Sequence, residues 1–453
     1  MKKIVLMCAV AFTLGGCGIY TKYQRPEVTD VVNRLYTPSN PDDSTSIASL
    51  EWEDLFTDER LQTLIRTGLR NNTDLNVARL KVVEAEAVLK TSKLAYVPSV
   101  AFSADGSVSN YDFERTSTGY SAGFDIGWEL DIFGRLTNAK RGAQAALMAS
   151  EAYRQAVQTQ LVATIADSYY TLLMLDEQLA ISRRTLDNWE ENIRTLEALK
   201  RAGKTNEAAV LQAKSNRLSV EGSVLTLTRQ IAQQQNSLCA LLGVTPHDIR
   251  RGNLAEQEFP EVLYTGIPAQ LLSRRPDVRQ AEMNLAQAFY NTNAARSEFY
   301  PKITLGGTLG WTSAGAAIAN PGSWLLNAVA GLVQPIFAKG QNKARLRTAQ
   351  ARQEQALLLF RQSLLDAGTE VNNALIQWQT AKERLEVDKK QILHLRAAVW
   401  NTKLLMKHGL TNYLEVLTAQ QNLLQAELTE ISDRYSEIQG VIQLYHSLGG
   451  GAK

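Results

Sequence analysis

The sequence has 453 residues and a net charge of +2, with 45% hydrophobic and 21% charged residues. A chain so close to neutral offers no broad basic surface, so we expect no nucleic-acid partner. Its four histidines are scattered singly and form no cluster with cysteine, which argues against a metal site. We find no phosphate-binding loop, nucleophile elbow or dinucleotide-binding turn, and we therefore expect neither an enzyme nor a bound cofactor.

The N-terminus is typical of an exported bacterial lipoprotein. Met1-Lys2-Lys3 is a short basic region, and residues 4–14 form an apolar run too brief to span a bilayer. The sequence Leu14-Gly15-Gly16-Cys17 resembles a lipobox, in which the cysteine sulfur receives a diacylglycerol. We predict a signal peptide over 1–16 and a lipid-anchored irregular segment over 17–58, held by acyl chains on Cys17. The alternative is an ordinary signal peptide followed by an accidental cysteine.

The rest of the chain contains the same unit twice. Residues 73–100 and 276–303 align without a gap, 203 positions apart. Towards the ends of the two units the shift is 206, where Gly203 matches Gly409. A register shared from the start to the end of each unit predicts a tandem duplication. The first repeat is placed at 59–259 and the second at 260–453.

Each repeat is expected to contain a helix, a β-hairpin, a long helix and a returning helix. The first helix, of about 35 residues, runs into Pro98 or Pro301, because proline cannot continue the hydrogen-bonding ladder and forces its predecessor into extended geometry. Alternation of apolar with small or polar residues then predicts hairpins over 99–130 and 302–333. The fold class is therefore mainly α, with four strands in two hairpins.

The clearest strand pattern is SAGFDIGWEL, in which Phe124, Ile126 and Trp128 alternate with Asp125 and Glu129. This gives one apolar and one polar face. Strands of about ten alternating residues match the requirement for crossing a bilayer in a tilted barrel. Aromatic residues near strand ends suit an interfacial girdle: Tyr120, Trp311 and Trp324.

Four such strands cannot close a barrel, and an open sheet edge in lipid leaves backbone groups without hydrogen bonds. Closure must therefore come from other copies of the chain. Two copies would give eight strands and a barrel filled by side chains, whereas three would give twelve and an open lumen. A soluble β-sandwich is the alternative.

Two long helices are predicted by apolar residues that recur at steps of four and three. One pattern runs from position 161 to 196 and the other from 414 to 445. This period of 3.5 residues is typical of a coiled-coil seam. At 1.5 Å per residue, a helix from Gly134 to Gly203 would be about 100 Å long. A compact soluble domain has no use for that length.

Four stretches carry a resemblance to a known family: EWEDLFTDERLQTLIRTGLRNNTDL at 51–75, LLSRRPDVRQAE at 271–282, YPKITLGGTLG at 300–310 and LVQPIFAKGQNKARL at 332–346. They are similar to the outer-membrane factor (TolC-like) family, in its lipoprotein branch serving RND-type multidrug efflux. The resemblance implies a homotrimer with a twelve-stranded β-barrel in the outer membrane of a Gram-negative bacterium and a long α-helical periplasmic tunnel. It also implies two protein partners, a periplasmic adaptor (membrane fusion protein) and an inner-membrane RND-type transporter.

The resemblance places the periplasmic end of the helices at the two turns between them. The residues expected at this tip, where the adaptor would make contact, are Gly203, Asn206, Lys407, Gly409, Asn412 and Tyr413. Members of the family constrict this end with a ring of acidic residues, which matches Glu415 here, whereas the next acidic position of the family is Thr418. A ring of Glu415 carboxylates would favour cations. The alternative is that Glu415 is a solvated charge on a helix face.

The predicted function is a passive channel through which drugs or other small molecules, delivered by an inner-membrane pump, leave the periplasm. The alternative is a lipid-anchored coiled-coil tether or periplasmic adaptor without a pore. A tether would explain Cys17 and the helical seams, but it would not explain four strands of membrane length.

Overall fold

The structure is a computed structural model of the whole chain. The residues that it describes are 20–28, 32, 34–35, 46–111, 113, 115–260, 265, 268, 274–314, 323–408 and 410–451. The predicted signal peptide over 1–16, the lipidation candidate Cys17 and the tip candidate Gly409 lie outside these residues.

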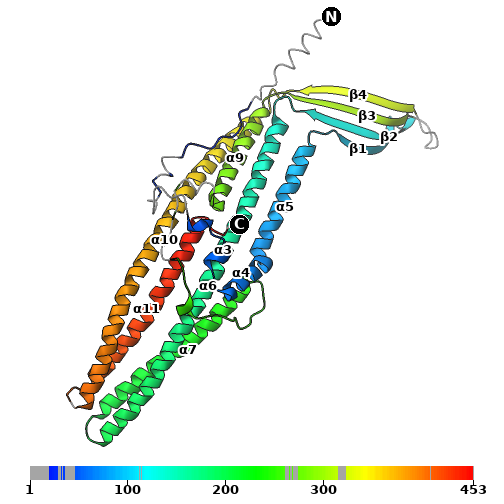
Figure 1. Cartoon of the computed structure of the whole chain (residues 1–453). Helices are drawn as coiled ribbons and strands as arrows, with labels where there is room; N and C mark the ends of the chain where they lie inside the picture. The colour runs from blue at the N-terminus through cyan, green and yellow to red at the C-terminus, as the bar shows by residue number, and fades with distance from the viewer. Residues whose placement is uncertain are drawn as a thin grey trace. The chain divides into compact units, whose positions relative to one another are not determined.

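The described elements follow the predicted order of helix, β-hairpin, long helix and returning helix, twice over (Figure 1). The first series consists of α3 (Trp52–Leu55), α4 (Glu59–Asn71), α5 (Thr73–Leu94), β1 (Ser99–Tyr111), β2 (Arg115–Leu130), α6 (Arg135–Arg201) and α7 (Glu207–Leu241). The second consists of α9 (Pro276–Ser297), β3 (Lys302–Ala314), β4 (Ser323–Val333), α10 (Gln341–Lys407) and α11 (Tyr413–Ser447). Short 3-10 helices occur at Ile47–Ser49 and Leu254–Glu256.

The two series match in the lengths of their helices. Helices α6 and α10 have 67 residues each, and α7 and α11 have 35 each. Helices α5 and α9 both have 22 residues. Because α6 starts at Arg135 and α10 at Gln341, every residue of one long helix has a counterpart 206 positions away in the other. The predicted duplication is thus confirmed in the structure.

The prediction of a single first helix of about 35 residues is wrong. In the first series two helices of 13 and 22 residues, α4 and α5, take its place. They are separated by Asn72, whose ψ of 129° leaves helical geometry. The Asn72 side chain accepts a hydrogen bond from the Leu75 amide and donates one to the Leu241 carbonyl, both at 2.9 Å. Apolar periodicity does not reveal this break, because a capping asparagine interrupts the backbone without interrupting the apolar face.

The chain divides into two compact units, and the long helices contribute residues to both. The sheet unit contains the strands and the helix segments next to them, Leu80–Ala152 and Gln280–Gln362, together with the described residues 20–27. The helical unit contains the remaining helix segments and both interhelical turns: Val28–Arg79, Tyr153–Arg279 and Ser363–Lys453.

The described strands of the sheet unit form one antiparallel sheet in the order β1-β2-β3-β4 (Figure 1). The two hairpins meet where β2 pairs with β3, from Gly119 opposite Ala314 to Leu130 opposite Ile303. Strand β2 begins at Arg115, earlier than its alternating pattern predicts, because its first residues extend the ladder with β1. Since β1 and β4 each pair with a single strand, both edges of the described sheet are open within one chain.

The predicted seam of α6 faces the interior of the helical unit, where residues such as Ile165 and Leu172 are fully buried. Near the interhelical turns, buried side chains of α6, α7 and α11 form one apolar cluster: Trp189, Ile193, Leu196, Val210, Ala213, Val220, Tyr413, Val416 and Leu417. The seam on α11 is less complete than predicted, since Leu414 and Gln421 are exposed.

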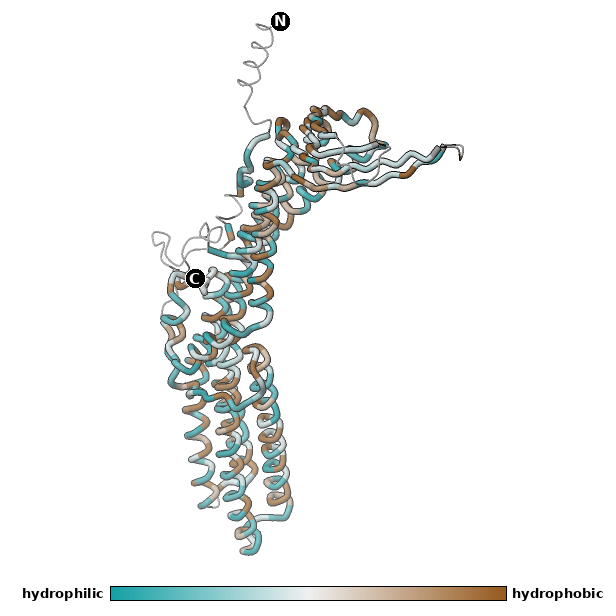
Figure 2. The backbone as a smooth tube through the Cα atoms, turned by 90° about the vertical axis from the view of Figure 1, so that its right-hand side faces the viewer, coloured by the Kyte–Doolittle hydropathy of each residue, from teal (hydrophilic) through white to brown (hydrophobic). Residues whose placement is uncertain are grey.

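Figure 2 shows how apolar and polar residues succeed one another in short segments along these helices. Every helix in the described part of the chain is too short or too polar to cross a bilayer.

Candidate functional site

One face of the sheet carries large apolar side chains that no other part of the described chain covers. The register places Phe102, Phe124, Leu309 and Leu326 in one row across the strands. These four side chains are between 45% and 79% exposed. The rings of Phe102 and Phe124 meet edge to face, with 5.4 Å between their centroids. A continuous apolar row of this kind marks an interaction surface, and on a strand of this length lipid is the fitting partner.

Aromatic side chains lie near both ends of the apolar face. Trp311 and Trp324 are paired across β3 and β4, with ring centroids 5.9 Å apart. Tyr120 lies on the same face, two positions along β2 from the residue that pairs with Trp311. Towards the other end, the Trp128 indole donates a hydrogen bond to the Tyr96 carbonyl at 2.9 Å. This distribution fits the interfacial girdle that the sequence predicts.

On β1, β2 and β3 the opposite face of the sheet carries small and polar side chains joined by hydrogen bonds, whereas β4 adds the exposed Leu325 and Val329 to it. Asp125 accepts a hydrogen bond from the Ser103 hydroxyl at 2.6 Å and another from the Thr308 hydroxyl at 2.8 Å. One carboxylate thereby joins β1, β2 and β3. At the end of β2, Glu129 binds the Arg135 guanidinium through hydrogen bonds of 2.7 and 2.5 Å. Because carboxylates need polar partners or water, this face suits an aqueous lumen.

The predicted helix-to-strand breaks lie directly before the strands. Pro98 precedes β1 and Pro301 precedes β3. Helix α5 ends at Leu94 and α9 at Ser297, so each helix ends a few residues before its proline. The missing N–H and fixed φ of proline then commit the chain to extended geometry. The two positions are equivalent in the duplication, and each aligns the first strand of a hairpin with the preceding helix.

The turn after α6 contains two of the predicted tip residues. Gly203 has a φ of +71°, and its amide donates to the Lys200 carbonyl at 3.0 Å, as in a glycine-terminated helix. Asn206 caps α7, because its side chain accepts a hydrogen bond from the Ala209 amide at 3.1 Å. Helix α6 ends at Arg201, two residues before the predicted glycine.

The turn before α11 repeats the cap and adds a buried aromatic ring. Asn412 accepts a hydrogen bond from the Glu415 amide at 3.3 Å. The Tyr413 side chain is 6% exposed and packs in the apolar cluster, and burial raises the pKa of its hydroxyl. Among the described residues that hydroxyl has no hydrogen-bond partner. Lys407, the last residue of α10, is exposed, so of these residues Tyr413 supports the turn from inside while Lys407 lies on the surface.

The two constriction candidates lie on the exposed side of α11. Glu415 is in the first turn of the helix, where the helix dipole favours a carboxylate. Thr418 is one turn further, and its hydroxyl donates to the Leu414 carbonyl at 2.9 Å. Both are exposed, whereas Val416 between them is buried, so both point away from the apolar cluster. The ring itself requires further copies of the chain and stays a prediction.

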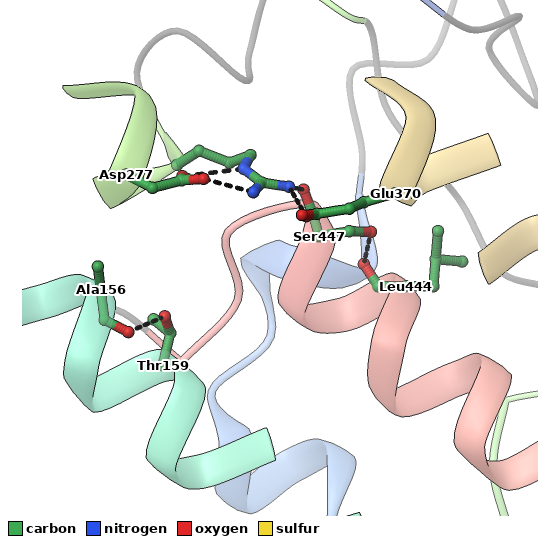
Figure 3. Close-up of polar contacts among 7 residues, drawn as sticks. Ala156, Thr159, Asp277, Glu370, Leu444 and Ser447 are labelled. Carbon is green, nitrogen blue, oxygen red and sulfur yellow. Dashed lines mark hydrogen bonds and ion pairs between the residues drawn. The ribbon is translucent and has the colours of Figure 1, made fainter. Parts of the chain in front are cut away.

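One buried arginine, Arg275, which sequence analysis used only as part of a family signature, has partners on three helices of the helical unit; Figure 3 labels these partners as Asp277, Glu370 and Ser447. The Arg275 guanidinium donates two hydrogen bonds to Asp277, at 2.9 and 2.5 Å. It also donates to Glu370 at 2.7 Å and to the Ser447 carbonyl at 2.9 Å. These contacts connect the start of α9, the middle of α10 and the end of α11 through a guanidinium that is itself buried, since Arg275 is 3% exposed. Burial, with the Arg275 charge, also lowers the pKa of the adjacent His446.

The first repeat has an equivalent contact. Asn72 and Arg275 each stand directly before the matched helices α5 and α9. Asn72 binds the carbonyl of Leu241, the last residue of α7, just as Arg275 binds that of Ser447, the last residue of α11. The alignment of the repeats at 203 positions was the signal that could have identified this pair. Among the described residues, no group of histidine, cysteine or carboxylate side chains is placed to hold a metal ion.

The chain contains two copies of a unit in which a β-hairpin is joined to long coiled-coil helices. The two hairpins form one four-stranded sheet with a lipid-facing side. This combination is typical of an outer-membrane efflux channel. The family model described as outer membrane efflux protein matches residues 64–244 and 267–450. The chain therefore belongs to the outer membrane efflux protein family, and it is the outer-membrane channel component of an efflux system.

The relatives agree with this assignment over the full length of the chain. The toluene efflux pump outer membrane protein TtgC of Pseudomonas putida is 30% identical over 99% of this chain and 96% of the relative. The probable outer membrane lipoprotein SilC of Salmonella typhimurium is 30% identical over 99% of both chains. Among solved structures, the open state of the MtrE outer membrane channel of Neisseria gonorrhoeae has a TM-score of 0.86 at 28% identity, covering 96% of this chain and 99% of that one. The predicted family, fold class and outer-membrane location are confirmed.

Proposed function

We propose that three copies of this chain form a twelve-stranded barrel in the outer membrane and an α-helical periplasmic tunnel, and that the assembly is a passive conduit to the exterior. The observation that carries this proposal is the four-stranded sheet with two open edges and an exposed apolar face. Every unpaired backbone group in lipid costs several kcal/mol. Strand β4 of one copy therefore pairs with β1 of the next until the ring closes.

The polar face of the sheet favours three copies over two. An eight-stranded barrel is filled by its own side chains, whereas a twelve-stranded one leaves room for water. Among the described residues Asp125 accepts hydrogen bonds from two hydroxyls, and Glu129, which Arg135 binds, lies on the same face. A filled interior would desolvate the Asp125 carboxylate at a cost that the two hydroxyls do not offset. A wet lumen avoids that cost.

The helical unit carries apolar stripes that match association of copies. On α7, Leu211, Leu218 and Leu225 are seven positions apart and between 57% and 69% exposed. On α10, Leu393 and Trp400 are also seven apart and are 68% and 66% exposed. Side chains at heptad spacing on a helix surface are typical of a coiled-coil seam whose partner is absent from the chain. In a trimer, α7 of one copy packs against α10 of the next.

The remaining assignments concern anchoring, partners and constriction. Acyl chains on Cys17 anchor each copy in the outer membrane, in keeping with the description of SilC as a lipoprotein. A periplasmic adaptor contacts the tip and links the channel to an inner-membrane RND-type transporter. The tip residues are Gly203, Asn206, Lys407, Gly409 and Asn412, with Tyr413 supporting them from within the cluster. Glu415, followed by Thr418, lines the constriction.

The proposal is tested by measuring the mass of the purified protein in detergent and its single-channel current in planar bilayers. We expect a trimer that produces discrete, cation-preferring current steps. A trimer without current would indicate that the tip is closed. In that case Glu415→Gln, which removes the charge from the constriction, should open the tip and produce a current. A monomer without current would refute the barrel and favour the coiled-coil tether.

A further inference from the structure

A cavity of about 320 Å³ lies in the helical unit between α6, α10 and α11. Its charged lining consists of Arg184, Arg396, Lys403 and Glu427. The Glu427 carboxylate is 8% exposed and is shared by Arg184 at 3.3 Å and Arg396 at 2.9 Å. The cavity lining therefore contains three cations for one carboxylate, and the side chains of both arginines are largely exposed.

The duplication supplies an internal comparison for these cations. In the first repeat, α6 presents Glu190 and Glu197, which are seven positions apart. Helix α7 supplies a cation for each of them. Arg217 binds Glu190 at 3.0 Å and Lys214 binds Glu197 at 2.8 Å. The α6–α7 pair thus neutralises its own charges at these two levels.

The second repeat reverses this pattern. Counted 206 positions on, Glu190 and Glu197 become Arg396 and Lys403, and their α7 partners become Leu423 and Gln420 on α11. All four of these residues line the cavity. Neither Leu423 nor Gln420 can neutralise a cation, and Arg396 forms its ion pair with Glu427 instead. Among the described residues no carboxylate forms an ion pair with Lys403. In the second repeat Arg396 therefore shares the single carboxylate of Glu427 with Arg184, and Lys403 has no carboxylate among the described residues.

We propose that this cavity receives two carboxylates of an acidic helix from the periplasmic adaptor, one beside Arg396 and one beside Lys403. The two cations are one heptad apart on α10, or about 10 Å, so the partner helix carries its acids seven residues apart. Leu423 and Leu424 also line the cavity and provide apolar surface against which that helix can pack. This inference rests on the proposed function, because it assigns a contact to the adaptor of the channel.

Charge complementarity favours the adaptor over a second copy of this chain. The stripes that suit association of copies are apolar and lie on exposed faces of α7 and α10. The cavity, in contrast, combines apolar residues with charged and polar ones and carries an excess of two positive charges. A charged groove of this kind selects its partner by attraction and sets its register, with an affinity that falls as salt rises.

The test uses the purified trimer in detergent and two synthetic α-helical hairpin peptides. One peptide carries two glutamates seven residues apart on one helix face, and its twin carries glutamines there. Binding is measured by fluorescence anisotropy at low salt. We expect the acidic peptide to bind about tenfold more tightly than its twin, since two partly exposed ion pairs together are worth about that factor.

Matched variants test whether the preference for the acidic peptide depends on Arg396 and Lys403. Arg396→Gln/Lys403→Gln should abolish the preference for the acidic peptide, and Arg396→Glu/Lys403→Glu should reverse it. The first variant keeps the test valid if repulsion from the neighbouring carboxylate prevents the second from folding. Lys389→Glu/Lys390→Glu, which makes the same charge change on exposed positions of α10, should retain the preference.

Three results would overturn the inference. The first is equal affinity of the two peptides for the wild type, including no binding of either. The second is an equal loss of preference in the Lys389/Lys390 variant. The third is dissociation of the trimer by Arg396→Gln/Lys403→Gln, which would make the cavity a subunit interface. The conductance of the wild type separates the two proposals. A wild type that conducts but does not prefer the acidic peptide refutes only the adaptor contact. A wild type that is monomeric and does not conduct refutes the channel.

Discussion

Replacing Arg275 by methionine is expected to lower the free energy of local unfolding at the end of α11 by about 2–4 kcal/mol. Methionine preserves most of the apolar stem but removes every hydrogen bond of the guanidinium. The side chains of Asp277 and Glu370 are 43% and 50% exposed, so water replaces much of what they lose, and each ion pair accounts for about 0.5 kcal/mol. The Ser447 carbonyl belongs to a residue that is 2% exposed, and leaving it without a partner costs about 1–3 kcal/mol.

Hydrogen exchange followed by mass spectrometry is the appropriate assay, because a protein with several units does not unfold in one two-state step. In the Arg275→Met variant, amides of the last two turns of α11 should exchange about 30-fold faster or more. Arg275→Lys should give an intermediate effect, since lysine keeps the charge but lacks the planar fork. Arg279→Met is the control, because Arg279 is exposed on α9, one turn after Arg275, and its hydrogen bond to Gln155 is 3.3 Å long. Unchanged exchange in Arg275→Met would refute the reasoning that this guanidinium holds the three helices together.

Three further outcomes are expected. Burial, followed by the hydrogen bond and charge of Asp433, raises the pKa of Asp388 to about 6. The native state then binds this proton more tightly than the unfolded chain, so stability falls as pH rises through about 4 to 6; Asp388→Asn should raise the melting temperature more at about pH 8 than at about pH 5, where only part of this loss has occurred, and equal effects at both values would contradict this. Glu415→Gln should weaken the cation preference of single channels, and unchanged selectivity would place the constriction elsewhere. Cys17→Ser should abolish labelling of the protein by radioactive palmitate in growing cells, and retained label would identify another acylation site.

Several features of the fold could be predicted because they depend on residues that are close in sequence. The strands of the two hairpins follow from alternation with a period of two, and the long helices from a period of 3.5, since each period is set by backbone geometry alone. Pro98 and Pro301 mark the strand starts through their own covalent chemistry. The duplication could also be predicted, because the two repeats align in the sequence, and the equal lengths of the matched helices follow from it.

Other features were decided by contacts between distant parts of the chain. No local pattern reveals that Asn72 ends one helix and begins another, because its amide is held by the carbonyl of Leu241. Tyr413 was expected at an adaptor-facing tip, yet the packing of α11 against α6 and α7 buries its ring.

By itself, the sequence determined the kinds of element, their order, their duplication and the membrane character of the strands, because backbone period and side-chain polarity are local properties. Only the tertiary structure decided which charges are satisfied within the chain. Arg275 and the carbonyl of Ser447 are 172 positions apart, and the Arg184–Glu427 pair is 243 apart. Whether such groups meet depends on how the helices pack against one another, and hydrophobic periodicity fixes which face of a helix is buried without fixing which residue lies opposite it.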